Sequence, residues 1–73
     1  MRFRYLVYES GIKLLFEMSG PRAGKVIWSS LDNDARLGGV YTVVPKARLG
    51  DGDFESDADS LEDLVETHIE KFL

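Results

Sequence analysis

Hydrophobic and polar positions alternate over residues 1–18 in the manner of two β-strands. Residues 2–8 are rich in aromatic and branched side chains, and residues 12–18 carry an apolar side chain at every second position. Between them lies Glu9-Ser10-Gly11, a turn signal in which glycine can adopt a positive φ. Alternation of this length is typical of half-buried strands. The sequence therefore predicts an antiparallel hairpin at the start of the chain.

Two further strands are predicted downstream of the hairpin. Lys25 to Ser29 carries Val, Ile and Trp in succession, and Val40 to Val44 is rich in β-branched residues. The second of these strands is expected to stop at Pro45, which cannot donate a hydrogen bond to a sheet. The segment between the two strands fits either a loop or one helical turn near Leu31–Leu37.

An amphipathic helix is predicted over residues 59–73. Asp59 and Glu62 have the spacing of a capping box just before an apolar run. Apolar residues then recur at helical spacing, with charged residues on the other side. The apolar stripe consists of Leu61, Leu64, Val65, His68, Ile69 and Phe72.

These elements predict an α+β fold in the order ββββα. It has a three- or four-stranded antiparallel sheet with the C-terminal amphipathic helix packed on one face. A length of 73 residues suits one domain, with strands in residues 1–45, an acidic loop in 46–58 and the helix in 59–73. The residues expected in the core are Phe3, Tyr5, Val7, Leu14, Phe16, Leu61, Leu64, Val65 and Ile69.

One face of the predicted sheet has no element to cover it. Pairing Phe3, Tyr5 and Val7 with Ile12, Leu14, Phe16 and Met18 gives an apolar face for the helix. The opposite face then carries basic, aromatic and aliphatic side chains, and the third strand adds an aromatic residue whose facing the sequence does not fix. This predicted sheet-face patch consists of Arg4, Leu6, Tyr8, Lys13, Leu15 and Trp28.

An uncovered patch of mixed polarity is typical of a contact surface. A second copy of the chain, giving a homodimer, is the first candidate partner, and a different protein is the second. Single-stranded nucleic acid is the third, with bases stacked on Tyr8 or Trp28 and phosphates on Arg4 and Lys13. A pI near 4.8 argues against nucleic acid.

Charge divides the chain into two unequal parts. Residues 1–48 contain eight Lys and Arg and four Asp and Glu, a net charge of +4, whereas residues 49–73 contain one Lys and nine Asp and Glu, a net charge of −8. One interpretation is internal compensation, in which the acidic part lies against a basic sheet rim. The other is that one part faces a charged partner.

The acidic part concentrates eight carboxylates within sixteen residues. It has three interpretations: a solvated loop beside the positive end of the helix dipole, a site for a partner with a basic surface, or a calcium loop. The second includes an inhibitor or regulator whose carboxylates imitate a row of nucleic-acid phosphates. The predicted acidic ridge consists of Asp51, Asp53, Glu55, Asp57, Asp59, Glu62, Asp63 and Glu66.

The calcium hypothesis depends on spacing alone. Asp51, Asp53, Glu55, Asp57 and Glu62 fall at positions 1, 3, 5, 7 and 12 of a twelve-residue segment, a spacing that resembles an EF-hand loop. The sixth position, where that loop requires glycine, is Ser56. Calcium is therefore kept only as an alternative, and no other cofactor is expected.

The residue types needed for catalysis are scarce. The chain has no cysteine and one histidine, His68, which falls within the apolar helix pattern and is expected to be packed. No apolar run approaches the roughly 20 residues that span a bilayer. We expect a non-enzymatic, cytoplasmic interaction module that binds a protein with a basic surface and no membrane.

Overall fold

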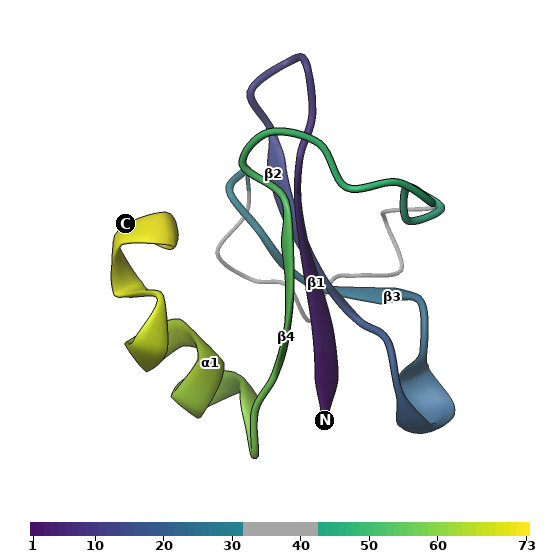
Figure 1. The fold of residues 1–73 in the computed structure, drawn as a ribbon, viewed down its shortest axis with the longest axis vertical. Helices are drawn as coiled ribbons and strands as arrows, with labels where there is room; N and C mark the ends of the chain where they lie inside the picture. The colour runs from purple at the N-terminus through teal and green to yellow at the C-terminus, as the bar shows by residue number, and fades with distance from the viewer. Residues whose placement is uncertain (32–42) are drawn as a thin grey trace.

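A computed structural model describes residues 1–31 and 43–73 of the chain (Figure 1). Four strands form one antiparallel sheet in the order β3-β2-β1-β4. The strands are β1 (Arg2–Val7), β2 (Lys13–Glu17), β3 (Lys25–Ser29) and β4 (Phe54–Asp57). The helices are the 3₁₀ helix η1 (Gly20–Arg22), α1 (Leu61–Thr67) and the 3₁₀ helix η3 (Ile69–Lys71). The predicted α+β fold in ββββα order is confirmed.

A three-residue loop closes the hairpin between β1 and β2. The Tyr8 N–H donates to the Ile12 carbonyl at 2.9 Å, and the Gly11 N–H donates to the Tyr8 carbonyl at 2.8 Å. Gly11 has a φ of 89°, a conformation that favours glycine. The loop places Tyr8 opposite Ile12 and, further along, Leu6 opposite Leu14.

The predicted grouping of side chains on the two sheet faces is wrong. Directly opposed residues of an antiparallel pair point to the same face, and Tyr5 lies opposite Leu15 while Phe3 lies opposite Glu17. Leu6 consequently shares its face with Leu14, a residue that the sequence assigned to the other face. Because the side-chain period of a strand is two, a register shift of one residue exchanges all the side chains of a strand between faces.

Both faces of the sheet bury apolar side chains. On the side of α1, a helix-side core consists of Phe3, Tyr5, Leu15 and Leu64. On the other side, a far-side core consists of Leu6, Leu14, Phe16 and Val26. The segment after residue 43 contributes to covering the far side: Arg4 donates to the Lys46 carbonyl at 2.8 Å, and the Lys46 ammonium lies 5.3 Å from the centroid of the Tyr8 ring.

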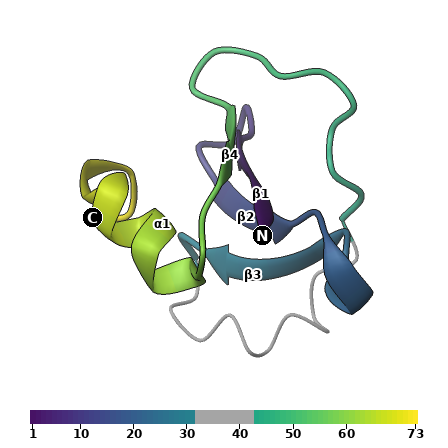
Figure 2. The same cartoon turned by 60° about the horizontal axis from the view of Figure 1, so that its bottom comes forward.

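A bulge in β3 determines which way Trp28 faces. Leu15 pairs with Trp28 but the next residue, Phe16, pairs with Val26, so Ile27 is an extra residue on this strand. Ile27 and Trp28 both pack against the helix-side core, while Val26 belongs to the far-side core. The sheet is strongly curled, and β3 crosses beneath β1 and β2 (Figure 2).

The fourth strand lies where the sequence predicted part of the acidic loop 46–58. Of the predicted strand Val40–Val44, residues 40–42 lie outside the described residues, and Val43 and Val44 are not in a strand. The predicted helical turn near Leu31–Leu37 also lies outside them from residue 32 onward. The strand that pairs with β1 is instead β4, because Phe54 supplies an aromatic ring to the helix-side core and Glu55 faces the arginines of β1.

The helix begins one residue later than the predicted capping box implies. The Ser60 hydroxyl accepts a hydrogen bond from the Asp63 N–H at 3.2 Å, so Ser60 is the N-cap in place of Asp59. The α-helix ends at Thr67, and after His68 the chain continues as η3. The predicted helix over 59–73 is therefore two shorter helices.

The core prediction holds in the sheet and only in part on the helix. Phe3, Tyr5, Leu14, Phe16 and Leu64 are buried, and Val7 and Leu61 are half-buried against the helix-side core. Val65 is half-buried but belongs to neither core, and Ile69 is 51% exposed. The apolar stripe of the helix therefore divides, and only part of it packs on the sheet.

An aromatic cluster fastens the C-terminal segment to the sheet. The ring of Tyr5 stacks on Phe54 at a centroid distance of 5.0 Å, and Phe72 packs edge-on against both Tyr5 and Trp28, at 5.4 and 4.7 Å. The Tyr5 hydroxyl also donates to the Lys71 carbonyl at 2.8 Å. Aromatic packing of this kind adds about 0.5–1.5 kcal/mol per pair beyond burial, so η3 is held in place although it is short.

Candidate functional site: the acidic strand and helix

The eight carboxylates of the predicted acidic ridge do not form one row. Asp53, Glu55 and Asp57 belong to β4 and the turn before it, where they contact basic residues of this chain. Asp59, on the approach to α1, and three acids within α1 are exposed, as is Asp51. The three acids within the helix are Glu62, Asp63 and Glu66.

Asp53 has a structural role. Its side chain is fully buried, and its Oδ2 lies 2.8 Å from the Lys46 ammonium. Its Oδ1 accepts from the Val7 N–H at 2.6 Å, and its Oδ2 also accepts from the Gly50 N–H at 2.7 Å. One carboxylate thus extends the β1–β4 ladder and closes the turn between residues 50 and 53.

The pKa of Asp53 lies below its usual value. Burial alone raises the pKa of this carboxyl, but hydrogen bonds from Lys46 and from the N–H groups of Gly50 and Val7 outweigh it. The folded state therefore favours the ionised form of Asp53, and the pairing contributes to stability at neutral pH.

Glu55 and Asp57 pair with two arginines of β1. Arg4 donates from Nε to Glu55 Oε2 at 2.8 Å, and Arg2 donates from Nη2 to Glu55 Oε1 at 3.1 Å. Arg2 also lies 3.2 Å from the more exposed Asp57. These arginines, Arg4 above all, hold the pKa of Glu55 below its usual range, against a smaller opposing effect of burial. The internal compensation predicted from the charge division is thus real for β4.

Two of the predicted calcium ligands are engaged by arginines of β1. Residues two apart in a strand share a face, and Glu55 and Asp57 point to the face occupied by Arg2 and Arg4, with which they form ion pairs. Asp53 is held by its own partners one residue before the strand. Within residues 1–31 and 43–73 no three Asp, Glu or His side chains are grouped as metal ligands. Calcium binding at these residues therefore stays a prediction made from the EF-hand spacing alone.

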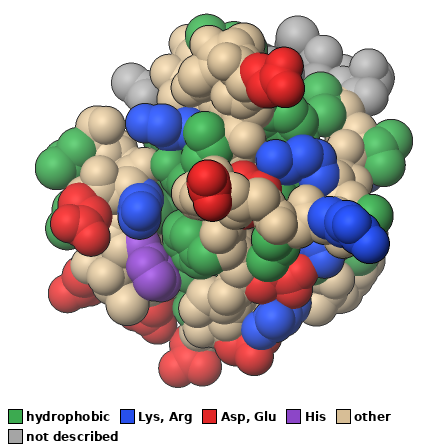
Figure 3. Space-filling view, turned by 45° about the horizontal axis from the view of Figure 1, so that its top comes forward, with side chains coloured by type: hydrophobic (Ala, Val, Ile, Leu, Met, Phe, Trp, Pro, Cys, Tyr) green, Lys and Arg blue, Asp and Glu red, His purple; other side chains and the backbone are tan. Residues whose placement is uncertain are grey.

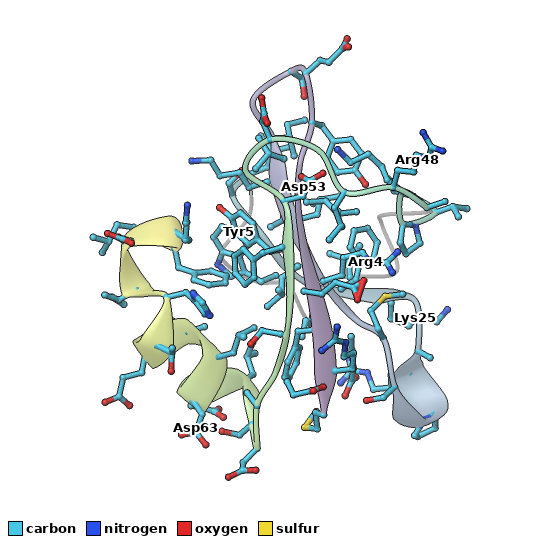
Figure 4. All side chains as sticks on the ribbon, in the orientation of Figure 1. Arg4, Tyr5, Lys25, Arg48, Asp53 and Asp63 are labelled. Atoms are coloured by element: carbon cyan, nitrogen blue, oxygen red, sulfur yellow. The ribbon has the colours of Figure 1, made fainter. Side chains whose placement is uncertain are left out.

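The acidic residues of the helix differ from those of the strand. Glu62, Asp63 and Glu66 are exposed, as is Glu70 of η3, and none of them pairs with a Lys or Arg of the described segments. Figure 4 shows Asp63 on α1, far from Lys25 and Arg48. In Figure 3 many Asp and Glu side chains gather along the border near His68, while most Lys and Arg side chains occupy the opposite half.

The residues of the predicted sheet-face patch lie on both faces of the sheet. Lys13, Leu15 and Trp28 lie on the helix side of the sheet, whereas Arg4, Leu6 and Tyr8 lie on the far side. Leu6 and Leu15 are fully buried. Arg4 points away from α1 (Figure 4) and is bound to Glu55. The six residues therefore do not share one face of the sheet, and a homodimer stays a prediction.

Tyr8 is enclosed on the far side. It lies in an apolar hollow of about 210 Å³ with Ile12 and Leu14, and its hydroxyl has no hydrogen-bond partner in the described segments. Burial raises the pKa of Tyr8, and the Lys46 ammonium partly offsets the shift. The hollow is flanked by Leu31 and Val43, the residues on either side of the undescribed segment.

An apolar stripe lies beside the acidic residues of the helix, and the sequence did not predict that it would be at the surface. Leu61, Val65 and Ile69 line an open hollow of about 500 Å³ together with Glu62 and Glu66. All three apolar residues were assigned to the core because one stripe at helical spacing does not reveal where a helix turns away from its sheet.

His68 is packed, as expected. It follows the last residue of α1, and its N–H donates to the Leu64 carbonyl at 3.1 Å. Its ring lies 4.5 Å, centroid to centroid, from Phe54. The position is that of a C-cap residue on the rim of the helix-side core.

No protein-family model, curated protein or solved structure matches this chain. None of the helices in the described parts of the chain combines the length and apolar character that crossing a bilayer requires.

Proposed function

We propose that this protein is a small non-catalytic interaction module whose exposed acidic helix binds a basic surface on another protein. The supporting observation is the contrast between two sets of carboxylates. Those at β4 are paired with Arg2, Arg4 and Lys46, whereas those of α1 are exposed and have no Lys or Arg partner in the described residues. Exposed like charges on one face attract an oppositely charged partner and guide its approach.

Of the predicted acidic ridge, we propose that only the carboxylates on and next to the helix bind the partner. Imitation of a nucleic acid requires a continuous row of carboxylates, but the row is interrupted at Asp53, Glu55 and Asp57, whose charges are compensated within the fold. The binding residues proposed here are Glu62, Asp63, Glu66 and Glu70, with Asp59 at the start of the helix. The protein would act as an inhibitor only if its partner uses that basic surface for its own activity, which binding would then block.

Two observations support a non-catalytic role. His68, the only histidine of the chain, is engaged in capping α1 and in packing on Phe54. The buried carboxylate of Asp53 accepts hydrogen bonds from the backbone and contacts Lys46, so it is held as a structural anion.

The test is affinity capture with two matched baits. One bait is the wild-type chain, and the other carries Glu62→Gln, Asp63→Asn, Glu66→Gln and Glu70→Gln. A control bait carries Glu9→Gln and Asp51→Asn, which remove exposed charges elsewhere. We expect the wild type and the control to retain the same protein, with a basic surface, and to release it as salt screens the charges.

The quadruple variant should retain much less of that protein. Equal retention by the quadruple variant, or release that does not depend on salt, would contradict the proposed function. A circular dichroism spectrum of each bait checks that the substitutions leave the fold intact.

A further inference from the structure

An apolar stripe runs along α1 and η3 between the acidic residues, and within the described residues only its first member, Leu61, packs against a core. Leu61, Val65 and Ile69 recur every four residues and line the hollow of about 500 Å³ that Glu62 and Glu66 border. Val65 and Ile69 pack in neither of the two cores, and Ile69 is 51% exposed. Exposed apolar residues rimmed by charge are typical of protein-binding surfaces.

Residues other than Val65 and Ile69 attach the helix to the sheet. Leu64 is 1% exposed and belongs to the helix-side core, and Phe72 packs against the rings of Tyr5 and Trp28. Figures 1 and 2 show the sheet on one side of α1 only. The hollow is thus presented by a helix that other residues hold in place, which lowers the ordering cost of binding.

The carboxylates around the hollow favour an occupant with a positive charge. Glu62 and Glu66 are part of its lining, and the chain from residue 49 onward carries a net charge of −8. A second copy of this chain, docked by the same face, would bring these carboxylates against their own equivalents, and such like-charge contacts cost several kcal/mol in interfaces. A partner with Lys or Arg beside its apolar residues fits both features.

The shape of the hollow favours a helical occupant. Leu61 and Val65 lie about one turn apart on α1, roughly 6 Å along its axis, and Ile69 follows at the start of η3. An extended peptide laid on a helix would leave its own N–H and C=O groups without backbone partners, whereas a helix satisfies them internally. Two helices can bury complementary apolar stripes by packing ridges into grooves.

We propose that this hollow binds a basic amphipathic helix of the partner protein. Apolar side chains at i, i+4 and i+7 of that helix would rest on Leu61, Val65 and Ile69. Lys or Arg on its flanks would face Glu62 and Glu66. The inference rests on the proposed function, to which it adds the structural class of the partner and the contact residues.

The probe is a synthetic peptide of about 16 residues with Leu at i, i+4, i+7 and i+11 and Lys and Ala elsewhere. One control peptide has the same composition in an order that destroys the apolar stripe. A second keeps the stripe but replaces Lys with Glu. Affinities for the full chain are measured by isothermal titration calorimetry at about 50 mM and about 300 mM salt.

Two substitutions in the protein separate the hollow from the rest of the surface. Val65→Ser and Ile69→Ser remove apolar contacts inside the hollow, and Leu49→Ser removes an exposed apolar side chain elsewhere. We expect the basic amphipathic peptide to bind, and each hollow variant to weaken it about tenfold or more. Leu49→Ser should leave the affinity within about twofold.

Each contrary outcome has a separate meaning. Equal binding of the scrambled basic peptide would overturn the helical occupant but leave the proposed function standing. Failure of both basic peptides to bind at low salt would contradict the proposed function as well. Unfolding of Val65→Ser and Ile69→Ser, as judged by thermal denaturation, would show that the stripe is part of the core. Sedimentation of the wild type as a dimer that these variants dissociate would assign the hollow to a second copy.

Discussion

Asp53 joins three segments of the chain through one buried carboxylate. It accepts from Val7 at the end of β1 and from Gly50 in the preceding turn, and it pairs with Lys46. Lys46 in turn donates to the Val7 carbonyl at 3.1 Å. The sequence showed only an acidic residue in an acidic stretch, because Val7 lies 46 positions before Asp53 and 39 positions before Lys46.

Replacing Asp53 with Asn should destabilise the fold by about 2–3 kcal/mol, the usual cost of losing charge-assisted hydrogen bonds to a buried group. The amide supplies one acceptor where two oxygens accept, and it leaves Lys46 without its counter-charge. Urea denaturation measures the change in the free energy of unfolding. A loss below about 0.5 kcal/mol would show that the network is not stabilising.

Asp53 also makes the stability of the fold depend on pH, and this contribution decreases as the pH falls. The pKa of Asp53 is lower in the folded state, so the unfolded state binds its proton first as the pH falls. The stability from this group is therefore complete above the unfolded pKa of about 3.9 and is lost as the pH falls through the folded pKa.

Denaturant midpoints at about pH 7 and about pH 3 test this dependence. The wild type should lose more stability between the two than Asp53→Asn, because the asparagine does not titrate. Glu55 titrates in both proteins and cancels in the comparison. An equal loss in the two proteins would contradict the assignment to Asp53.

Gly52 is required by both its conformation and its surroundings. It has a φ of 84°, and a Cβ there would lie 3.2 Å from Val7 Cγ2. Gly11 has a φ of 89° with nothing within 4 Å of such a Cβ. Gly11→Ala should cost about 1–2 kcal/mol from backbone strain alone, and Gly52→Ala should cost more. Thermal denaturation of both variants measures the difference in stability. If Gly52→Ala loses no more stability than Gly11→Ala, the Val7 side chain moves aside without an energetic penalty.

At the scale of elements, the predictions succeeded where local signals act alone. The hairpin follows from alternation and from Glu9-Ser10-Gly11, and a C-terminal helix follows from helical spacing. The sheet faces were misassigned because the register of the hairpin depends on the length of its turn. Both strands carry apolar side chains on both faces, so the apolar pattern fits either register. The strand β4 was missed because its four residues, Phe54–Asp57, carry two acids, and the pairing of these acids with arginines of β1 is not visible in a local sequence pattern.

The start of α1 offers a direct comparison between the expected and observed caps. The Ser60 hydroxyl accepts from the Asp63 N–H, whereas Asp59 precedes the cap. Ser60→Ala should reduce stability by about 1 kcal/mol, and Asp59→Ala by a few tenths through the helix dipole, about 0.3 kcal/mol. Chemical denaturation distinguishes the two, and a larger loss for Asp59→Ala would restore the cap predicted from sequence.

The two sides of the helix should respond differently to truncation. Leu64 is buried in the helix-side core, so Leu64→Ala should cost about 2–5 kcal/mol and leave little folded protein. Ile69 is 51% exposed, so Ile69→Ala should change stability by about 0.5 kcal/mol. Circular dichroism melting curves provide the comparison. Similar losses in the two variants would place Ile69 in the core.

At the scale of the whole molecule, the acidic residues fall into two groups: those paired with basic residues of the fold and those exposed on the helix. The sequence establishes that residues 49–73 are strongly acidic, but it does not tell which acids are compensated. The structure assigns Asp53, Glu55 and Asp57 to the fold through Lys46 and two arginines, and leaves the acids of α1 exposed. That division depends on the pairing of β4 with β1, a contact across some fifty positions that local sequence patterns do not encode.

The most direct test of this division is a residue-resolved ¹H–¹⁵N NMR titration of the full chain with the basic amphipathic peptide at low salt. The account predicts that the largest shift changes fall on residues 61–70, with little change in β4 or at Arg2 and Arg4. Changes concentrated on β4 and its arginines, or spread evenly over the sheet, would contradict it.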